Sequence, residues 1–248
     1  MSRVVVVSGG GTGIGRAAAA RFAADGDDVV IVGRRPGVLA EAAAAMGGSV
    51  TPLVADLASP EGAALVAGAV AEGFGRVDVL VNNAGGNTDL GDDLPGRDRL
   101  ERTATAWLAN YRANVLTAVL LTTALTDLLS GGGRVILLSS IAAYRGSGSG
   151  SYGSVKAALH PYAVDLAGAL GERGVTVNVV APGFTDETEF FAGTMTDARR
   201  ERLVGQTLTG RAGTVADVAG TIHWLATPAA AQITAQVIQV NGGALPGR

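Results

Sequence analysis

Two side chains in the segment SYGSVKAALH, residues 151–160, could act together in proton transfer. Tyr152 and Lys156 are four residues apart in an alanine-rich segment, and this spacing places them on one face of a helix. Lys156 is the only lysine in the chain, which otherwise uses arginine for its cationic side chains. With four tyrosines present, a chance spacing of this kind has a probability on the order of 1–2%. The pair is therefore a candidate reactive centre.

The chemistry of the two groups gives a reason for their proximity. Free tyrosine has a pKa of about 10, and a nearby ammonium stabilises the phenolate. Such a partner would make Tyr152 a proton donor and acceptor closer to neutral pH. A compact ammonium also reaches ribose hydroxyls in a way that the planar guanidinium of arginine does not. We therefore expect Tyr152 to be a general acid and base with Lys156 as its partner.

The composition excludes several other classes of protein. The 248 residues are 48% apolar and 4% aromatic, which favours a single domain, residues 1–248, with an aliphatic core. A formal net charge of −3 with scattered arginines argues against a nucleic-acid partner. Cysteine is absent and His160 and His223 lie far apart in sequence, so no metal site is expected. Without a signal peptide or an apolar run of about 18 residues, we expect no membrane association and a cytoplasmic location.

Short β-branched runs alternate with alanine-rich segments along the chain. The expected strands are residues 4–7, 29–32, 50–54, 77–81, 135–138, 175–180 and 237–240. The expected helices are residues 14–25, 37–46, 60–73, 100–129, 152–171 and 215–226. The near-continuous apolar character of the strands predicts burial on both faces. The alternation predicts an α/β fold with a single doubly wound parallel sheet of the Rossmann type, helices on both faces, and ligands beyond the carboxyl ends of the strands.

A glycine-rich turn, SGGGTGIG from Ser8 to Gly15, follows the first expected strand and precedes a helix. Glycines allow a pyrophosphate to approach the backbone closely, and the first N–H groups of the helix favour an anion. A plain tight turn is the alternative, and the position between strand and helix disfavours it. A Walker-type phosphate loop is also disfavoured because no Gly-Lys-Ser/Thr follows.

The second expected strand ends in Gly33-Arg34-Arg35, about twenty residues after the glycine turn, where a dinucleotide site reads the ribose. NAD sites usually place Asp or Glu there. The paired guanidinium groups of Arg34 and Arg35 instead match a 2′-phosphate in charge and geometry. This predicts NADP(H) as the preferred cofactor, with NAD(H) possible. A solvated basic entry to the next helix is the alternative.

Together these motifs resemble the short-chain dehydrogenase/reductase family in its single-domain form, and the 3-oxoacyl-carrier-protein reductases within it. The matches occur in the order of the family and cover nearly the whole chain. They are Ser8-Gly9-x-x-x-Gly13-x-Gly15, Asp56-Leu57, Asn82-Asn83-Ala84-Gly85, Ser139-Ser140, Tyr152-x-x-x-Lys156, and Asn178 with Pro182-Gly183.

The resemblance implies a set of cofactor-binding residues. They are Gly9, Thr12, Gly13, Ile14, Gly15, Arg34, Arg35, Asp56, Leu57, Asn83, Ala84, Gly85, Tyr152, Lys156, Pro182, Gly183 and Thr188. Within this set Asp56 and Leu57 would border the adenine, and the segment 83–85 would border the adjoining ribose. Lys156 would hold the nicotinamide ribose, with Thr188 on the carboxamide.

The resemblance also implies the catalytic set Asn114, Ser140, Tyr152 and Lys156. Ser140 would bind the substrate oxygen while Tyr152 donates the proton. Asn114 would hold a water molecule in a proton relay, and Asn110, one turn earlier, is the weaker candidate for that role.

Three departures from the family pattern bear on these assignments. The spacing from Ser140 to Tyr152 is one residue shorter than usual, and Ser139 would restore it. Because adjacent strand residues point to opposite faces, only one of the two serines can serve, and we expect Ser140. The segment 182–188 is one residue longer, so Thr185 competes with Thr188. The glycine turn lacks the basic residue that often supports NADP, so the cofactor prediction rests on Arg34 and Arg35.

The substrate side is predicted less sharply. Residues 184–210 fall where the family has a substrate lid, and their apolar side chains indicate either a partly hydrophobic small-molecule carbonyl or ordinary lid packing. Apolar stretches at 118–129 and 157–170 predict a homotetramer or homodimer. The expected function is an NADP(H)-dependent oxidoreductase acting on a carbonyl or secondary alcohol. The alternative is a catalytically silent NADP(H)-sensing regulator, which the complete Ser, Tyr and Lys set disfavours.

Overall fold

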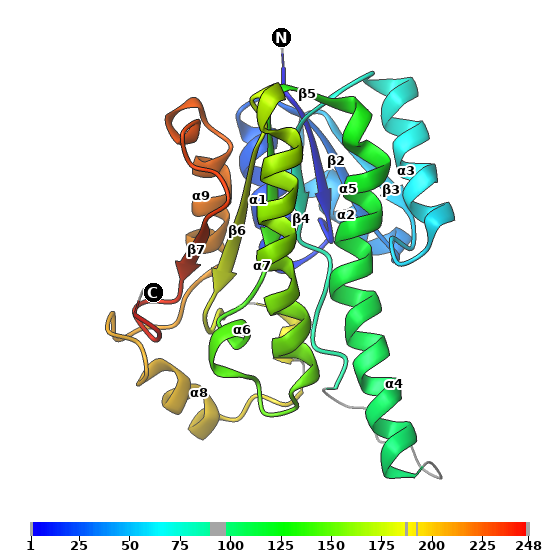
Figure 1. The fold of residues 1–248 in the computed structure, drawn as a ribbon. Helices are drawn as coiled ribbons and strands as arrows, with labels where there is room; N and C mark the ends of the chain where they lie inside the picture. Colours follow the sequence, from blue (N-terminus) through cyan, green and yellow to red (C-terminus); the bar gives the residue numbers. More distant parts are fainter. Residues whose placement is uncertain (1, 90–97, 187, 192, 247–248) are drawn as a thin grey trace.

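The computed structural model describes residues 2–89, 98–186, 188–191 and 193–246. In this part of the chain a parallel seven-stranded sheet has the order β3-β2-β1-β4-β5-β6-β7 (Figure 1). Its strands are β1 (Val4–Ser8), β2 (Asp28–Gly33), β3 (Val50–Val54), β4 (Val77–Asn82), β5 (Leu129–Leu138), β6 (Thr176–Pro182) and β7 (Val237–Val240). The strand order reverses between β1 and β4, which is where a doubly wound sheet binds its ligand. The predicted fold class is confirmed.

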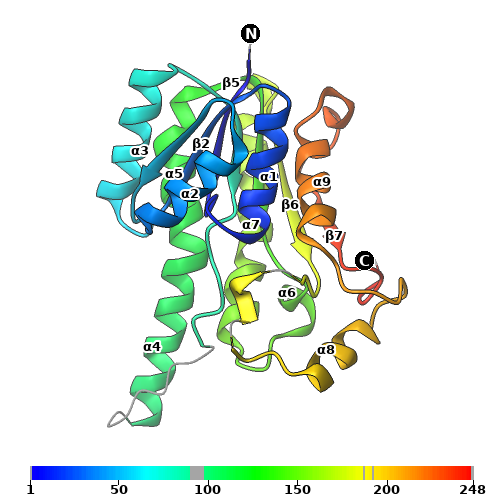
Figure 2. The same cartoon turned by 180° about the vertical axis from the view of Figure 1, so that it is seen from behind.

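Helices cover both faces of the sheet. One face carries α1 (Gly13–Ala24), α2 (Pro36–Met46) and α9 (Val215–Leu225), which lie in front in Figure 2. The other face carries α3 (Pro60–Gly73), α5 (Thr117–Leu125) and α7 (Ser151–Leu170), with α4 (Arg99–Tyr111) reaching beyond the sheet (Figure 1). None of the helices in the described ranges is long and apolar enough to cross a bilayer.

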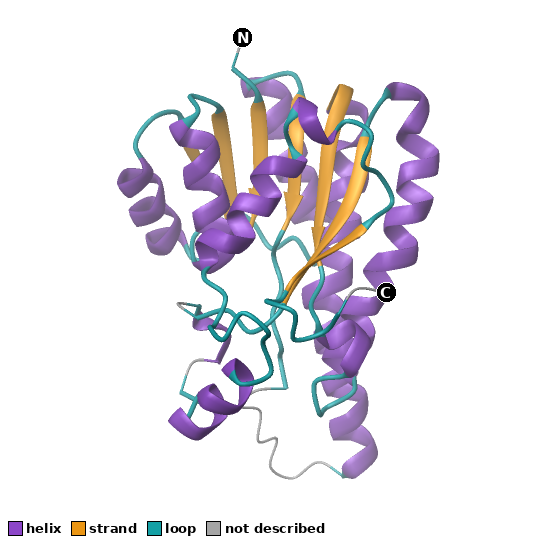
Figure 3. Cartoon of the chain, turned by 90° about the vertical axis from the view of Figure 1, so that its left-hand side faces the viewer, coloured by secondary structure: helices purple, strands orange, loops and turns teal. Residues whose placement is uncertain are grey.

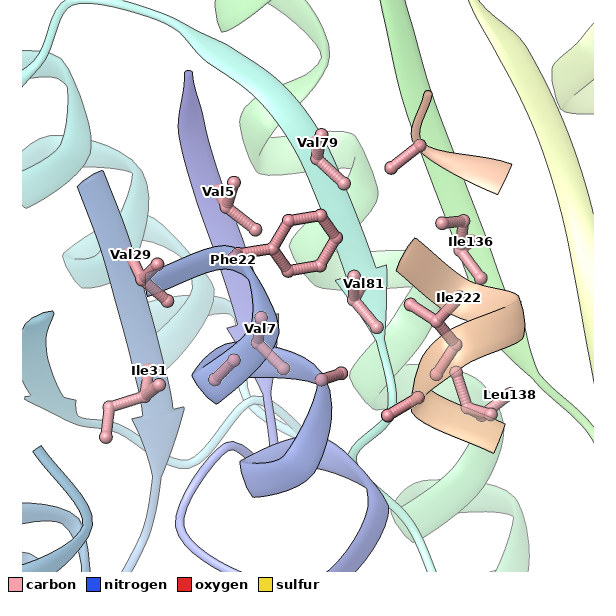
Figure 4. Close-up of a cluster of buried hydrophobic side chains, with 14 of the residues drawn as sticks. Val5, Val7, Phe22, Val29, Ile31, Val79, Val81, Ile136, Leu138 and Ile222 are labelled. Carbon is pink, nitrogen blue, oxygen red and sulfur yellow. The ribbon is translucent and has the colours of Figure 1, made fainter. Parts of the chain in front are cut away.

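The two sides of the sheet form two hydrophobic cores. On one side Phe22 of α1 packs over Val5 and Val7 of β1 and Val79 and Val81 of β4 (Figure 4). Side chains alternate along a strand, so Val6, between Val5 and Val7, belongs to the other core. This explains why β1 is apolar at successive positions. Burying a side chain such as Phe22 completely stabilises the fold by roughly 1.5–3 kcal/mol.

The edge strands depart from the expectation of burial on both faces. β3 and β7 pair on one side only and their residues are partly exposed, with Val54 at 48% exposure. A strand at the edge of the sheet is covered less completely by the helices than a central one. Pro52 is compatible with this position because an edge strand leaves one row of N–H groups without a ladder partner.

The helix expected over residues 100–129 is interrupted. α4 ends at Tyr111, a π-helical turn occupies Arg112–Leu116, and α5 follows until a 3-10 turn at Thr126–Leu128. β5 begins at Leu129, earlier than expected, and its pairing with β4 shifts register between Val77 and Val79. The sequence of the turn, RANVL, gives no sign of the change from an α-helix to a π turn.

The carboxyl ends of the parallel strands lie at one edge of the sheet, where loops and short helices gather (Figure 3). The short helices are α6 (Ala142–Arg145) and α8 (Asp197–Val204), and a 3-10 turn named η4 covers Glu189–Phe191. α8 was not predicted because its sequence, DARRERLV, has too few apolar residues to show a helical stripe.

Candidate active site

A cleft of about 970 Å³ lies at this edge of the sheet. Every sequence-predicted site residue lines it except Gly15 and Asn114. The fold thus brings together residues from the glycine turn, β2, the loops after β3 and β4, α7 and the loop after β6.

The glycine turn is held in a conformation that side chains would disturb. Gly9 and Gly13 have φ angles of +66° and +52°, in the region that favours glycine. A Cβ atom on Gly15 would lie 2.3 Å from the Gly9 carbonyl oxygen, so Gly15 packs directly against the backbone of the turn. Thr12 is the N-cap of α1, and its side chain makes no capping hydrogen bond with the described residues. The start of α1 therefore offers N–H groups to an anion in the cleft.

Asn83 joins β4 to the glycine turn. Its Nδ2 donates hydrogen bonds to the backbone oxygens of Ser8 and Gly9, at 3.0 and 3.2 Å. In return the Ser8 hydroxyl accepts from the backbone N–H groups of Asn83 and Ala84. The Asn83 amide is therefore engaged within the protein, and its side chain positions the turn.

Arg34 and Arg35 both line the cleft at the end of β2, and they differ in their contacts. Arg35 forms an ion pair with Glu189 of η4, with 2.8 Å between Nη2 and Oε2. Arg34 has no ion pair or hydrogen bond with the described residues. Asp56 and Leu57 follow β3 on the same side of the cleft. The close approach of backbone atoms in the glycine turn and the Arg34 guanidinium, which has no ion pair with the described residues, fit a nicotinamide dinucleotide.

Tyr152 and Lys156 lie where the four-residue spacing predicts, on one face of α7 and both buried. The Nζ atom of Lys156 is 5.9 Å from the centre of the Tyr152 ring and donates a hydrogen bond of 2.7 Å to the Leu138 oxygen. The Ser140 hydroxyl accepts the Ala142 N–H at 3.1 Å and lies near the Tyr152 phenol, whose pKa it lowers. The ring of Phe190 packs against that of Tyr152, with 5.4 Å between ring centres and an interplanar angle of 56°. The lysine thus lies beneath the tyrosine, and the serine lies beside the phenol.

Burial sets the pKa values of this pair. It raises the pKa of Tyr152 to about 12, with the Ser140 hydrogen bond acting in the opposite direction. It lowers the pKa of Lys156 to about 8. The sequence-based expectation of a Tyr152 pKa shifted towards neutrality by the ammonium is not met here. The Lys156 ammonium donates its hydrogen bond to the Leu138 oxygen. The loss of solvent around the phenol raises the pKa of Tyr152 more than the contact with Ser140 lowers it.

The two neighbouring serines point in different directions. Ser139 is buried, and its hydroxyl donates to the Lys156 backbone oxygen at 2.9 Å and lies 2.9 Å from Nε2 of His160. Because Ser139 donates its single hydroxyl proton to that oxygen, His160 is the donor in the second contact. Ser140 instead makes the contact with Tyr152. Ser140 lies on the cleft wall beside Tyr152, and its role as the serine that binds the substrate oxygen stays a prediction.

Asn114 lies behind the wall of the cleft. It is 1% exposed, in the π turn, and its Oδ1 accepts a 3.0 Å hydrogen bond from the Gly86 N–H. Its Nδ2 donates to the backbone oxygens of Gly86 and Asn110, both at 2.9 Å. A Cβ atom on Gly85 would lie 2.5 Å from Asn114 Oδ1. The Asn114 side chain therefore shapes the loop after β4, and a relay through a water molecule stays a prediction.

A buried polar network beside Tyr152 was not anticipated. Nδ2 of Asn110 donates to Oδ1 of Asp89 at 2.8 Å and to the Ser151 hydroxyl at 3.1 Å. Ser151 in turn donates to the other Asp89 carboxylate oxygen. Asn110 and Ser151 are 0% and 1% exposed. The network joins the loop after β4, α4 and the residue preceding Tyr152, and only the fold brings these distant residues together.

The threonines after β6 take different positions. Thr185 is buried, donates to the Gly183 oxygen at 3.3 Å and pairs with Gly213 in an isolated β-bridge. Thr188 lies against the glycine turn, where a Cβ on Gly13 would be 3.7 Å from its Cγ2. Pro182 and Gly183 close the same end of the cleft. Thr188 is thus the threonine next to the turn.

Aromatic rings gather at the substrate end. Phe191 packs against Phe190 and Phe184, with ring centres 4.7 and 5.8 Å apart, and the Arg199 guanidinium lies 4.9 Å from the Phe191 ring centre. The expected lid, residues 184–210, therefore contributes apolar surface to the cleft. Residues 187 and 192 of this segment lie outside the described residues.

Comparison with known sequences shows similarity to oxidoreductases. The family model for enoyl-(acyl carrier protein) reductase matches residues 9–244. An uncharacterized oxidoreductase of Mycobacterium tuberculosis is 38% identical, covering 97% of this chain and 91% of the relative. A 3-oxoacyl-[acyl-carrier-protein] reductase of Synechocystis is 36% identical, covering 98% of this chain and 96% of the relative.

Solved structures agree with this placement. A short-chain dehydrogenase/reductase from Brucella melitensis has a TM-score of 0.89 and 29% identity, covering 99% of this chain and 97% of its own. A blue fluorescent protein from a metagenomic library, solved in complex with NADPH, has a TM-score of 0.86 and 30% identity, covering 98% of both chains. The glycine turn, the buried Tyr152–Lys156 pair and these relatives lead to one conclusion. The chain belongs to the short-chain dehydrogenase/reductase family and is an NAD(P)-dependent oxidoreductase.

Proposed function

We propose that this protein uses NADP(H) to transfer a hydride between the nicotinamide and a carbonyl or secondary alcohol, in the manner of a ketoreductase. The observation that carries the proposal is the contact of Ser140 with the buried phenol of Tyr152, above Lys156, in a cleft that also contains the glycine turn. Arg34, which has no ion pair or hydrogen bond within the described part of the chain, supports the choice of NADP(H). The Synechocystis reductase and the NADPH-bound structure support the same class of reaction.

When bound, the nicotinamide would supply the hydride in reduction and accept it in oxidation. With its pKa raised to about 12, Tyr152 holds its proton at neutral pH and can donate it to the substrate oxygen. Ser140 is positioned to hydrogen-bond the same oxygen. The Lys156 ammonium, charged below pH 8, would stabilise the tyrosinate that remains after donation. The positioning of these groups would supply much of the catalysis.

The cleft is proposed to take a small molecule with a partly apolar body, because the rings of Phe184, Phe190 and Phe191 lie at its substrate end. We also propose that the chain forms a homotetramer or homodimer. Large apolar side chains are exposed on the outer surfaces of α4 and α7, namely Leu100, Trp107, Leu108, Tyr111 and Val164. Light scattering after gel filtration would measure the number of subunits.

The reaction is tested with Tyr152→Phe and a matched control, Tyr144→Phe, at a residue outside the cleft lining. NADPH and NADH binding is followed by fluorescence, and turnover by cofactor oxidation with a panel of ketones. We expect Tyr152→Phe to lose roughly 10²–10⁴-fold in turnover while binding NADPH like the wild type, because only the proton donor is removed. Retained turnover would refute the role of Tyr152. NADPH binding by the wild type without turnover of any ketone would favour the regulatory alternative.

A further inference from the structure

The η4 turn touches both ends of the cleft. Glu189 pairs with Arg35 at 2.8 Å, and the next residue, Phe190, lies on the Tyr152 ring at 5.4 Å between centres. One short turn from the substrate segment therefore contacts a residue assigned to the cofactor and a residue assigned to the reaction. The first of these contacts has a consequence for cofactor choice.

The partner of Arg35 is a carboxylate from this chain. The Arg35 and Glu189 side chains are 58% and 59% exposed, so their ion pair is screened by water and can be exchanged. Arg34 beside it has no ion pair with the described residues, and Asp56, another acid on the cleft wall, accepts the Ala58 N–H. In this conformation, therefore, Arg34 is available to a ligand anion and Arg35 is already engaged.

The two cofactors differ in what they demand of this pair. A 2′-phosphate carries a charge near −2. Guanidinium donors therefore stabilise it, and a carboxylate beside those donors destabilises it. To use Arg35 it must displace Glu189, and a carboxylate left nearby repels it. A ribose 2′-hydroxyl makes neither demand, because a neutral hydroxyl can donate a hydrogen bond to a carboxylate.

We propose that Glu189 is a specificity-determining residue that competes with the 2′-phosphate for Arg35 and thereby sets the ratio of NADPH to NADH affinity. The inference rests on the proposed dinucleotide site. Arg34 and Arg35 favour the phosphorylated cofactor and Glu189 opposes them, so the chain is less selective than its two arginines alone would make it.

The test compares Glu189→Gln with Glu201→Gln, which removes the same charge from α8 at a residue without an ion pair to the described residues. Dissociation constants are measured by fluorescence titration for NADPH and NADH, and by calorimetry for 2′,5′-ADP and 5′-AMP. We expect Glu189→Gln to tighten NADPH and 2′,5′-ADP by about fivefold, which equals about 1 kcal/mol, and to leave NADH and 5′-AMP within about twofold. Glu201→Gln should leave the NADPH to NADH ratio unchanged.

A double variant shows whether Arg35 carries the effect. Arg35→Gln should weaken NADPH, and adding Glu189→Gln to it should change the ratio by much less than in the wild type, because only the repulsion by the carboxylate is then removed. The proposal is overturned by an unchanged ratio in Glu189→Gln, by an equal change in Glu201→Gln, or by a full effect of Glu189→Gln without Arg35. A wild type that prefers NADH would contradict the proposed cofactor, whereas the change of ratio in Glu189→Gln would still decide the role of Glu189.

Discussion

The two ends of the cleft are built in different ways. At the cofactor end, the glycine turn and the start of the loop after β4 are held by contacts of backbone atoms, such as the bonds from Asn83 to the Ser8 and Gly9 oxygens. At the substrate end, the described parts of residues 184–210 are held by backbone hydrogen bonds at Phe184, Asp186, Leu208 and Thr209 and, in addition, by long side chains at the surface. Their pairs are Arg35 with Glu189, Arg145 with Gln206, and Arg200 with Asp186.

The two kinds of contact restrict the amino-acid sequence to different degrees. Close backbone contacts leave one steric solution, so the residues that make them are restricted to glycine or to one side chain. Exposed pairs contribute about 0–1 kcal/mol each and can be exchanged for others. Such a cleft can keep one cofactor site while the residues at the substrate end change to accept different substrates.

The sharpest test of the comparison is Gly15→Ala. The added Cβ would lie 2.3 Å from the Gly9 oxygen and 2.4 Å from Asn83 Nδ2, so backbone must move. We expect a loss of more than about 3 kcal/mol in the free energy of unfolding, or NADPH binding too weak to measure. Gly37→Ala is the control, because nothing lies within 4 Å of its added Cβ, and we expect it to be neutral or stabilising by up to about 1 kcal/mol. Urea unfolding of both variants gives the result; a tolerant Gly15 would remove the distinction between the two ends.

Lys156, between the two ends, should make stability depend on pH. Burial lowers its pKa from 10.5 to about 8, so between these values the folded protein has released a proton that the unfolded chain still binds. The free energy of unfolding therefore rises with pH across this window, by up to about 3 kcal/mol. Lys156→Met lacks this titration. Urea unfolding of both proteins from pH 7 to 10.5 measures the difference, and parallel curves would contradict a buried ammonium.

Ser151→Ala tests whether the position of Tyr152 depends on the polar network beside it. The change removes a donor to Asp89 and leaves buried polar groups without that partner, at a cost of about 1–3 kcal/mol in stability. We expect turnover to fall about tenfold with cofactor affinity unchanged, because α7 no longer holds the phenol in place. Ser154→Ala, on an exposed position of the same helix, is the control. Equal behaviour of the two variants would assign the network to stability alone.

Much of the fold follows from the sequence. Every expected strand is present, with ends differing by at most two residues except at the start of β5, because buried parallel strands are apolar at successive positions. The pattern does not distinguish edge strands, so the exposure of β3 was missed. It also missed α8, whose charged sequence has no apolar stripe, and the π turn, which changes hydrogen bonding without changing composition.

The site was predictable where its residues are neighbours in sequence. The glycine turn and the Tyr152–Lys156 pair are local motifs, and both lie in the cleft. The contacts of Glu189 with Arg35 and of Asp89 with Ser151 join residues 154 and 62 positions apart, and no local pattern announces them. The pKa values of Tyr152 and Lys156 were also out of reach, since they depend on how completely the fold excludes water.

The π turn at Arg112–Leu116 sets the helical phase between α4 and α5. A π turn contains one residue more than an α-helical turn, and one residue corresponds to a rotation of about 100° about the helix axis. Deleting one residue here would rotate α4 relative to α5 and carry Asn110 away from Asp89 and Ser151. The number of residues in this segment therefore decides which side of α4 faces the cleft.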